Sequence, residues 1–170
     1  MKGKLNMKCL CFSDSHGSPY NIRLALNKHP DAEVIFFLGD GLRDLEDFIL
    51  DRSRAFLVVQ GNCDYSSLLG DQNVKKTDSI TLMGKRIIFT HGDLYGVKYG
   101  IDGVKKLALD HSADLVLFGH THQALEQYIS TDGGGFYLFT PGSIGAGFGG
   151  ASYGVINITD KGILLSLGRL

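Results

Sequence analysis

The sequence predicts an α/β fold in which two mixed β-sheets pack together and are flanked by helices, an αββα sandwich. Short apolar runs rich in β-branched and aromatic residues alternate with helical patterns along the first two thirds of the chain. These runs lack clean polar alternation, which is typical of strands that are covered on both faces. The last third contains hairpin patterns, so we expect two sheets instead of one.

Length and composition are those of one globular domain. The chain has 170 residues, of which 44% are apolar and 21% charged, enough to bury a sizeable core. We predict a single domain over residues 1–170, with residues 1–6 as an N-terminal extension because the first strand begins at Met7. The net charge of −1 gives no global field for a nucleic-acid duplex or an anionic membrane. No run reaches the ~18–20 apolar residues that span a bilayer and no secretory signal is evident, so we expect a cytoplasmic protein without membrane contact.

The elements follow in a regular order. Five apolar runs are predicted strands, at residues 7–12, 34–38, 56–59, 86–89 and 115–118. Helices are predicted from Pro19, after an N-cap at Ser18, to the residue before Pro30, and over 42–50 and 101–111, because apolar residues recur there at helical spacing. Hairpin turns are predicted at 83–84, 132–135 and 160–162.

Each of the five strands ends in side chains that can bind a metal ion. These are Asp14 and His16, then Asp40, Asn62 and His91, and finally His120 and His122. The carboxyl ends of the strands form the ligand crevice of open α/β sheets, so we expect these side chains to meet there. Gly39, Gly61 and Gly119 precede three of the ligands, as expected where the backbone turns sharply or approaches another group. The remaining histidines, His29 and His111, lie near helix C-termini and are assigned no chemistry.

The donor types indicate the chemistry. Imidazole combined with carboxylate suits Mn²⁺, Fe²⁺, Zn²⁺ or Ni²⁺, and the absence of thiolate ligands argues against a closed structural zinc site. Seven ligands are too many for one ion but suffice for two if one carboxylate bridges. Paired ions ~3.5–4 Å apart are the usual device for displacement at phosphorus.

The ordered series D-x-H, GD, GN, H and GHxH resembles the calcineurin-like metallophosphoesterase superfamily. The short chain resembles its compact bacterial and archaeal phosphodiesterase branch, and the similarity extends from Asp14 to residues 140–143. The resemblance implies two metal sites that share a bridging Asp40 and a metal-bridging hydroxide that attacks phosphorus, with Asp40, Asn62 and His91 as catalytic residues. It assigns one ion to Asp14, His16, Asp40 and His122, and the other to Asp40, Asn62, His91 and His120.

Cys63 departs from the family pattern. Many members have a histidine after the metal-binding Asn, where it contacts the phosphate or the leaving group. A thiol is a weak donor, so we interpret Cys63 as a non-essential substitute. A weak phosphate contact, which would make Cys63 a weak catalytic candidate, and a redox-sensitive role stay open. Asp64 is interpreted as the cap of the following turn, and Thr140 stands where the family often has Asn.

The leading hypothesis is a dinuclear-metal phosphodiesterase that hydrolyses a small phosphodiester with two divalent transition-metal ions, Mn²⁺ in the first place. One alternative is a non-catalytic metal-binding scaffold, since a eukaryotic relative of this branch acts in a membrane-coat assembly. Another is a phosphomonoesterase. Substrate contacts are unknown, although Tyr65, Tyr95 and Phe148 are candidates for selecting the substrate, and homo-oligomerisation stays open.

Overall fold

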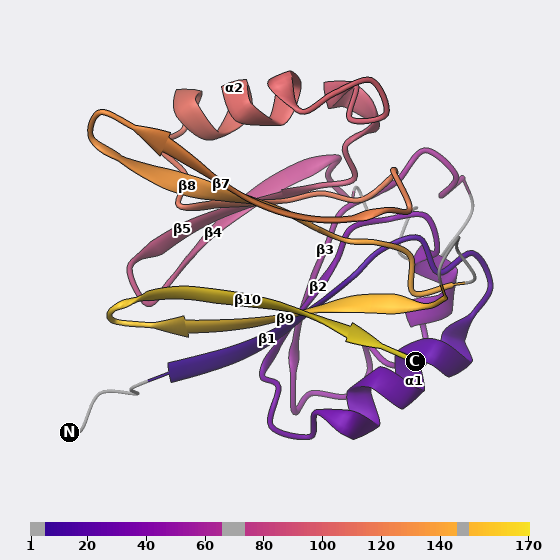
Figure 1. Cartoon of the computed structure of the whole chain (residues 1–170). Coiled ribbons are helices and arrows are strands. Elements are labelled where there is room, and N and C mark those ends of the chain that lie inside the picture. The colour runs from indigo at the N-terminus through magenta and orange to yellow at the C-terminus, as the bar shows by residue number, and fades with distance from the viewer. Residues whose placement is uncertain (1–5, 66–73, 146–149) are drawn as a thin grey trace.

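The structure is a computed structural model that describes residues 6–65, 74–145 and 150–170. Two five-stranded sheets pack face to face, with the strand orders β10-β9-β1-β2-β3 and β4-β5-β6-β8-β7. Figure 1 shows α2 on the outside of one sheet and α1 on the outside of the other. The predicted αββα sandwich is therefore confirmed.

The first sheet has a parallel half and an antiparallel half. Strands β1, β2 and β3 pair in parallel, whereas β9 pairs antiparallel with both β1 and β10. Its strands are β1 (Asn6–Phe12), β2 (Val34–Phe37), β3 (Ala55–Val58), β9 (Ser152–Thr159) and β10 (Gly162–Arg169).

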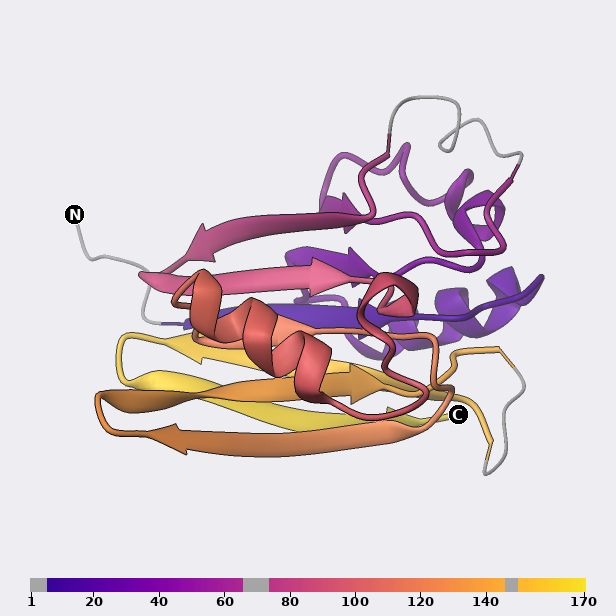
Figure 2. The same cartoon turned by 90° about the horizontal axis from the view of Figure 1, so that it is seen from above.

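The second sheet is mixed in the same way. Strands β5, β6 and β8 pair in parallel, and β4 and β7 are antiparallel edge strands. Its strands are β4 (Thr77–Leu82), β5 (Lys85–Thr90), β6 (Leu115–Leu117), β7 (Ala124–Thr131) and β8 (Gly134–Pro141). Figure 2 shows the turns of the three hairpins at one end of the sandwich and the longer loops at the other end.

Two α-helices and two short 3-10 helices complete the described elements: α1 (Pro19–Lys28), α2 (Asp102–Asp110), η1 (Leu42–Leu45) and η3 (Asp93–Tyr95). Pro19 opens α1 as predicted, but the Ser18 side chain makes no capping hydrogen bond. The predicted helix over 42–50 is wrong, because a 3-10 helix ends at Leu45 and turns follow. Leu42, Leu45 and Phe48 are buried at intervals of three, and three residues per turn is the period of a 3-10 helix.

The core lies mainly between the sheets. Phe36 of β2 and Phe89 of β5 meet edge to face there, with ring centroids 5.3 Å apart. Cys9 and Cys11, which alternate in β1 and so share one face of the strand, are fully buried in the same cluster. Two further clusters attach α1 and α2 to the outer faces of the sheets. Among the described residues, no helix has the length and apolar character that crossing a bilayer requires.

Candidate metal centre

All seven predicted ligands lie at one end of the sandwich, in two groups. The outer group contains Asp14, His16 and His122, and the inner group contains Asp40, His91 and His120 together with Asn62. Within each set of three His and Asp residues, the ligand atoms lie within 4.8 Å of one another. The side-chain Oδ1 of Asn62 belongs to the inner group, because it lies 3.1 Å from His91 Nε2.

The outer group is organised around a buried carboxylate with one unused oxygen. Asp14 Oδ2 accepts hydrogen bonds from the Ser13 hydroxyl and, at 3.0 Å, from the backbone N–H of His120. Asp14 Oδ1 is buried without a hydrogen-bond partner in the described part of the chain. The Nε2 atoms of His122 and His16 lie 3.1 and 3.8 Å from it and 3.3 Å from each other. A buried orphaned oxygen is costly, and a shared cation would satisfy it and both imidazoles.

The inner group has its ligand atoms oriented by the backbone. His91 Nδ1 donates to the Leu38 carbonyl at 2.7 Å, so in the neutral imidazole Nε2 carries the lone pair that faces the site. That Nε2 lies 3.1 Å from His120 Nδ1 and 3.3 Å from Asp40 Oδ2. The other oxygen of Asp40 accepts from the Cys63 N–H at 2.7 Å. Imidazole, carboxylate and amide atoms thus converge on one point, and this donor set fits a divalent transition-metal ion.

The charges of the inner group are coupled. Burial on its own would raise the pKa of Asp40, but hydrogen bonds from His91 and from the Cys63 N–H hold that pKa well below its ordinary value. Burial would lower the pKa of His91, yet the hydrogen bond with Asp40 and the charge of Asp14 raise it. For His120, burial and the neighbouring His91 and Lys98 lower the pKa. Because its pKa is lowered, Asp40 is a carboxylate at neutral pH.

The ligands sit on strained backbone. Asp14, His16, Asp40, His120 and His122 all have left-handed backbone, with φ between 42° and 68°. Among the other described residues that are not glycine, only Met83 and Ser112 have a positive φ. Such a conformation costs roughly 1–3 kcal/mol per residue and persists where the surrounding structure enforces it. The strain is thus concentrated at the predicted ligands.

The glycines beside the ligands are required by close approach, as predicted. A Cβ on Gly39 would overlap the backbone of Gly61, and a Cβ on Gly61 would overlap the carboxylate of Asp40. A Cβ on Gly119 would overlap Ser13 and press on Asp14. A side chain at Gly61 or Gly119 would therefore press on a candidate ligand, and one at Gly39 would push apart the two loops that carry Asp40 and Asn62.

Asp64 has a positioning role that the sequence did not indicate. Its buried carboxylate accepts hydrogen bonds from four backbone N–H groups, those of Asp40, Gly41, Leu42 and Gly61, at 2.8–3.0 Å. It thereby joins the loop after β2 to the loop after β3 and fixes the backbone of Asp40. The turn that it was predicted to cap lies mostly outside the described residues.

A cleft of about 330 Å³ opens beside the metal ligands. Its lining includes His16 and Asp40, together with Arg43, Asp44, Cys63 and Tyr65. Burial, and then the neighbouring Asp40, raise the pKa of the Cys63 thiol, so Cys63 is a neutral thiol at neutral pH. Arg43 was missed by the sequence analysis, although its position three residues after Asp40 is the signal that could have found it.

The other residues named from the sequence differ in their outcome. Thr140 Oγ1 faces the carbonyl of Gln123 at 3.5 Å, next to His122, and so lies against the backbone of the outer group. Tyr95 is partly buried against α2, and its hydroxyl is 3.1 Å from the Thr77 hydroxyl. Phe148 and residues 1–5 lie outside the described residues.

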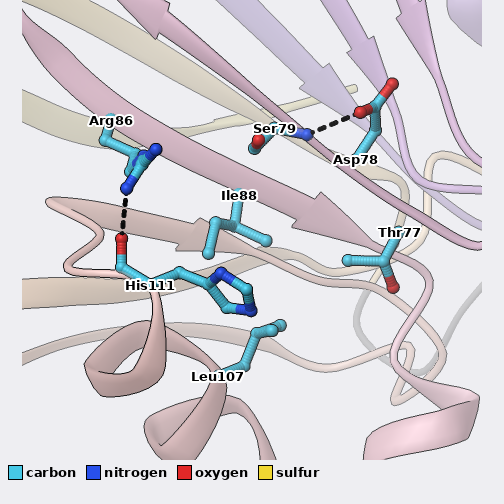
Figure 3. A pocket seen from close by; sticks show the side chains of 7 residues that line it. All are labelled: Thr77, Asp78, Ser79, Arg86, Ile88, Leu107 and His111. Atoms are coloured by element: carbon cyan, nitrogen blue, oxygen red, sulfur yellow. Dashed lines mark hydrogen bonds between the residues drawn. The ribbon is translucent and has the colours of Figure 1, made fainter.

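A second pocket lies on the outer face of β4 and β5, against α2 (Figure 3). Ile88 and Leu107 line it, and the Arg86 guanidinium donates to the His111 carbonyl at 2.7 Å. No predicted metal ligand is among its lining residues. The candidate metal ligands that line a pocket, His16 and Asp40, therefore belong to the cleft at the loop end of the sandwich.

Comparisons with known proteins agree with this geometry. The model of the calcineurin-like phosphoesterase superfamily domain matches residues 7–161. The probable metallophosphoesterase YsnB of Bacillus subtilis is 32% identical over 141 residues, which are 81% of this chain and 75% of YsnB.

Two solved structures have the same fold. A predicted phosphoesterase from Streptococcus pneumoniae superposes with a TM-score of 0.80 at 21% identity and covers 98% of this chain and 91% of its own. An archaeal phosphodiesterase superposes with a TM-score of 0.73 at 22% identity and covers 96% of this chain and 100% of its own. The chain belongs to the calcineurin-like phosphoesterase superfamily.

Proposed function

We propose that this metallophosphoesterase is a phosphodiesterase that hydrolyses a small phosphodiester with two divalent ions, Mn²⁺ in the first place. The observation that carries the proposal is that two groups of candidate ligands lie side by side, joined by the hydrogen bond from the His120 N–H to Asp14 Oδ2, while Asp14 Oδ1 is left orphaned in the outer group. Fe²⁺, Zn²⁺ and Ni²⁺ suit the same donors, so availability decides between them. When bound, such ions supply Lewis acidity, lower the pKa of a water molecule and offset charge on phosphoryl oxygens.

The residues of this chain have separable roles in that reaction. The outer and inner groups hold the ions, and Asp40, which lies in the inner group and lines the cleft, is the candidate bridging carboxylate. His91 is kept in one tautomer by the Leu38 carbonyl, which keeps Nε2 directed at the site. His16 and Cys63 form part of the wall of the cleft that receives the phosphate.

The lining of the cleft bears on which leaving groups can depart. Asp40, Asp44 and Asp64 line it, and bound metal ions would offset the charge of these carboxylates and of the substrate. Cys63 is a neutral thiol and Asp64 is occupied by backbone N–H groups, so neither is a strong proton donor for a leaving group. We therefore expect preference for diesters with good leaving groups.

The test compares bis-p-nitrophenyl phosphate with p-nitrophenyl phosphate as substrates. The protein is stripped with chelator, given Mn²⁺, Zn²⁺, Ni²⁺ or Mg²⁺ in turn, and assayed beside Asp40→Asn and His120→Ala. We expect diester turnover that needs metal and both residues. Faster turnover of the monoester would instead establish a phosphomonoesterase, and a folded, metal-binding but inactive protein would support a scaffold.

A further inference from the structure

Among the described residues that line the cleft, one Arg side chain is not used by the proposed metal ligation. Arg43 belongs to η1 and lines the cleft with His16, Cys63 and Tyr65. We propose that the Arg43 guanidinium binds the non-bridging oxygens of the substrate phosphate and is a substrate-binding residue of this chain. The inference rests on the proposed function, because it assumes that a phosphate group sits at the metal ions.

Arg43 is available for such a ligand because no described residue pairs with its side chain. Asp44, its neighbour in sequence and in the cleft, accepts from the Ser15 hydroxyl at 2.6 Å and from the Gly17 N–H at 2.8 Å through the same oxygen. These bonds attach Asp44 to the loop that carries Asp14 and His16. The Arg43 side chain is exposed and forms no hydrogen bond or ion pair with any residue in the described ranges.

The electrostatics of the cleft give this guanidinium particular weight. The charged side chains around it are the carboxylates of Asp40, Asp44 and Asp64, and Arg43 is the only Lys or Arg among the described lining residues. Another nearby cation, Lys76, is bound to the Gly61 carbonyl at 2.9 Å and lies 3.6 Å from Asp93. An anion that enters the cleft is therefore attracted by Arg43 and by the metal ions, and repelled by the remaining charges.

The shape of the guanidinium matches the expected ligand. Its planar fork can donate two parallel hydrogen bonds to two oxygens of one phosphate, whereas a lysine ammonium acts as a point charge. This makes Arg43→Lys an informative variant, because it keeps the charge and removes the fork.

The experiment measures kcat and KM for bis-p-nitrophenyl phosphate with Arg43→Gln, Arg43→Lys and the wild type, all loaded with Mn²⁺. Arg52→Gln is the matched control, since Arg52 is also exposed and does not line the cleft. A second readout is equilibrium binding of inorganic phosphate to each metal-loaded protein by calorimetry. Thermal melts and metal content confirm that the variants stay folded and loaded.

We expect Arg43→Gln to raise KM about tenfold or more and to weaken phosphate binding by a similar factor, as for the loss of charge-assisted hydrogen bonds. The KM and the phosphate affinity of Arg43→Lys should lie between those of the wild type and those of Arg43→Gln. Both values of Arg52→Gln should match the wild type. Values for Arg43→Gln that equal those of Arg52→Gln in both readouts would overturn the inference and leave the proposed function intact. A wild type that turns over no diester would refute the proposed function, and phosphate binding would still decide the role of Arg43.

Discussion

The two ligand groups differ in how firmly the protein holds them. In the inner group, the side chains of His91 and Asp40 are 0% and 3% exposed, and both are oriented by hydrogen bonds to the backbone. In the outer group, the side chains of His16 and His122 are 40% and 39% exposed. No described residue bonds to the second ring nitrogen of either histidine.

This difference in exposure and orientation predicts a difference in metal affinity between the two groups. Partners that orient a metal ligand are typically worth 10–100-fold in affinity or activity. We therefore expect the inner group to bind its ion more tightly and the outer group to exchange its ion with solvent. The open group also lies on the cleft through His16, where it can meet a substrate.

The largest expected effect comes from removing an inner ligand. His91→Ala should lower diester turnover by more than about 100-fold, because a ligand acts more directly than the partners that orient it. The metal content of the His91→Ala protein after gel filtration should be one equivalent lower than that of the wild type. His111→Ala, at the C-terminal end of α2, is the control and should resemble the wild type. Retention of both ions by His91→Ala would contradict the assignment.

The next effect concerns the backbone that supports the inner group. Asp64→Asn replaces one acceptor oxygen with a donor, so two of the four N–H groups lose their partner. The free energy of unfolding of the metal-free protein should fall by about 2–4 kcal/mol. Asp47→Asn, at an exposed position, is the control for denaturant unfolding. Equal stability of the two variants would exclude the positioning role.

A smaller effect is expected in the outer group. His16→Ala should weaken binding of the second ion about 10–100-fold while the first ion stays bound, because an exposed ligand without orienting partners contributes less. Excess Mn²⁺ should then restore much of the turnover. Loss of the tightly bound ion from this variant would show that the two groups are not independent.

The pH dependence of metal affinity should reflect the titration of His91 in the inner group. The pKa of His91 lies above its ordinary value of 6.5, so a part of the metal-free protein carries a proton there at neutral pH. A metal ion needs the neutral imidazole, so affinity should rise with pH, by up to about tenfold per unit for each proton displaced, and level off above the raised pKa. Calorimetry in two buffers of different ionisation enthalpy measures the proton release. Affinity that falls between pH 6 and pH 8 would contradict this sign.

The smallest effect is expected at Cys63, which lies on the cleft but holds no ion. Cys63→Ala should keep at least about a tenth of the wild-type turnover on an activated aryl diester, since a good leaving group needs no proton and general acid catalysis is then unnecessary. Steady-state kinetics with bis-p-nitrophenyl phosphate measures this, and complete loss of turnover would show that Cys63 is essential.

The sequence allowed much of the fold and the grouping of the ligands to be predicted, for a local reason. The strands are short runs of β-branched and aromatic residues that can be read directly from the sequence, and Asp14, Asp40 and His91 follow strands whose carboxyl ends meet at one end of the sandwich. The helix predicted over 42–50 was wrong because apolar spacings of three and of four residues differ little over nine residues.

What could not be predicted depends on contacts between distant segments. Asp64 bonds to N–H groups 22–24 residues earlier, and no local pattern reports such a contact. The left-handed backbone at Asp14 and His120 likewise depends on packing, because this conformation is uncommon for residues other than glycine, although Asp and His adopt it more often than most. Arg43 stands three residues after Asp40 in the sequence, but the fold is needed to show that it lines the same cleft as Asp40 and His16.

The most direct test of the account is a Mn²⁺ titration of chelator-stripped protein in which bound metal and diester turnover are measured on the same samples. We expect two binding steps, in which the first ion is held tightly and turnover rises only as the second ion binds. A single step, or full turnover at one equivalent of metal, would contradict a centre built from an enclosed inner group and an open outer group.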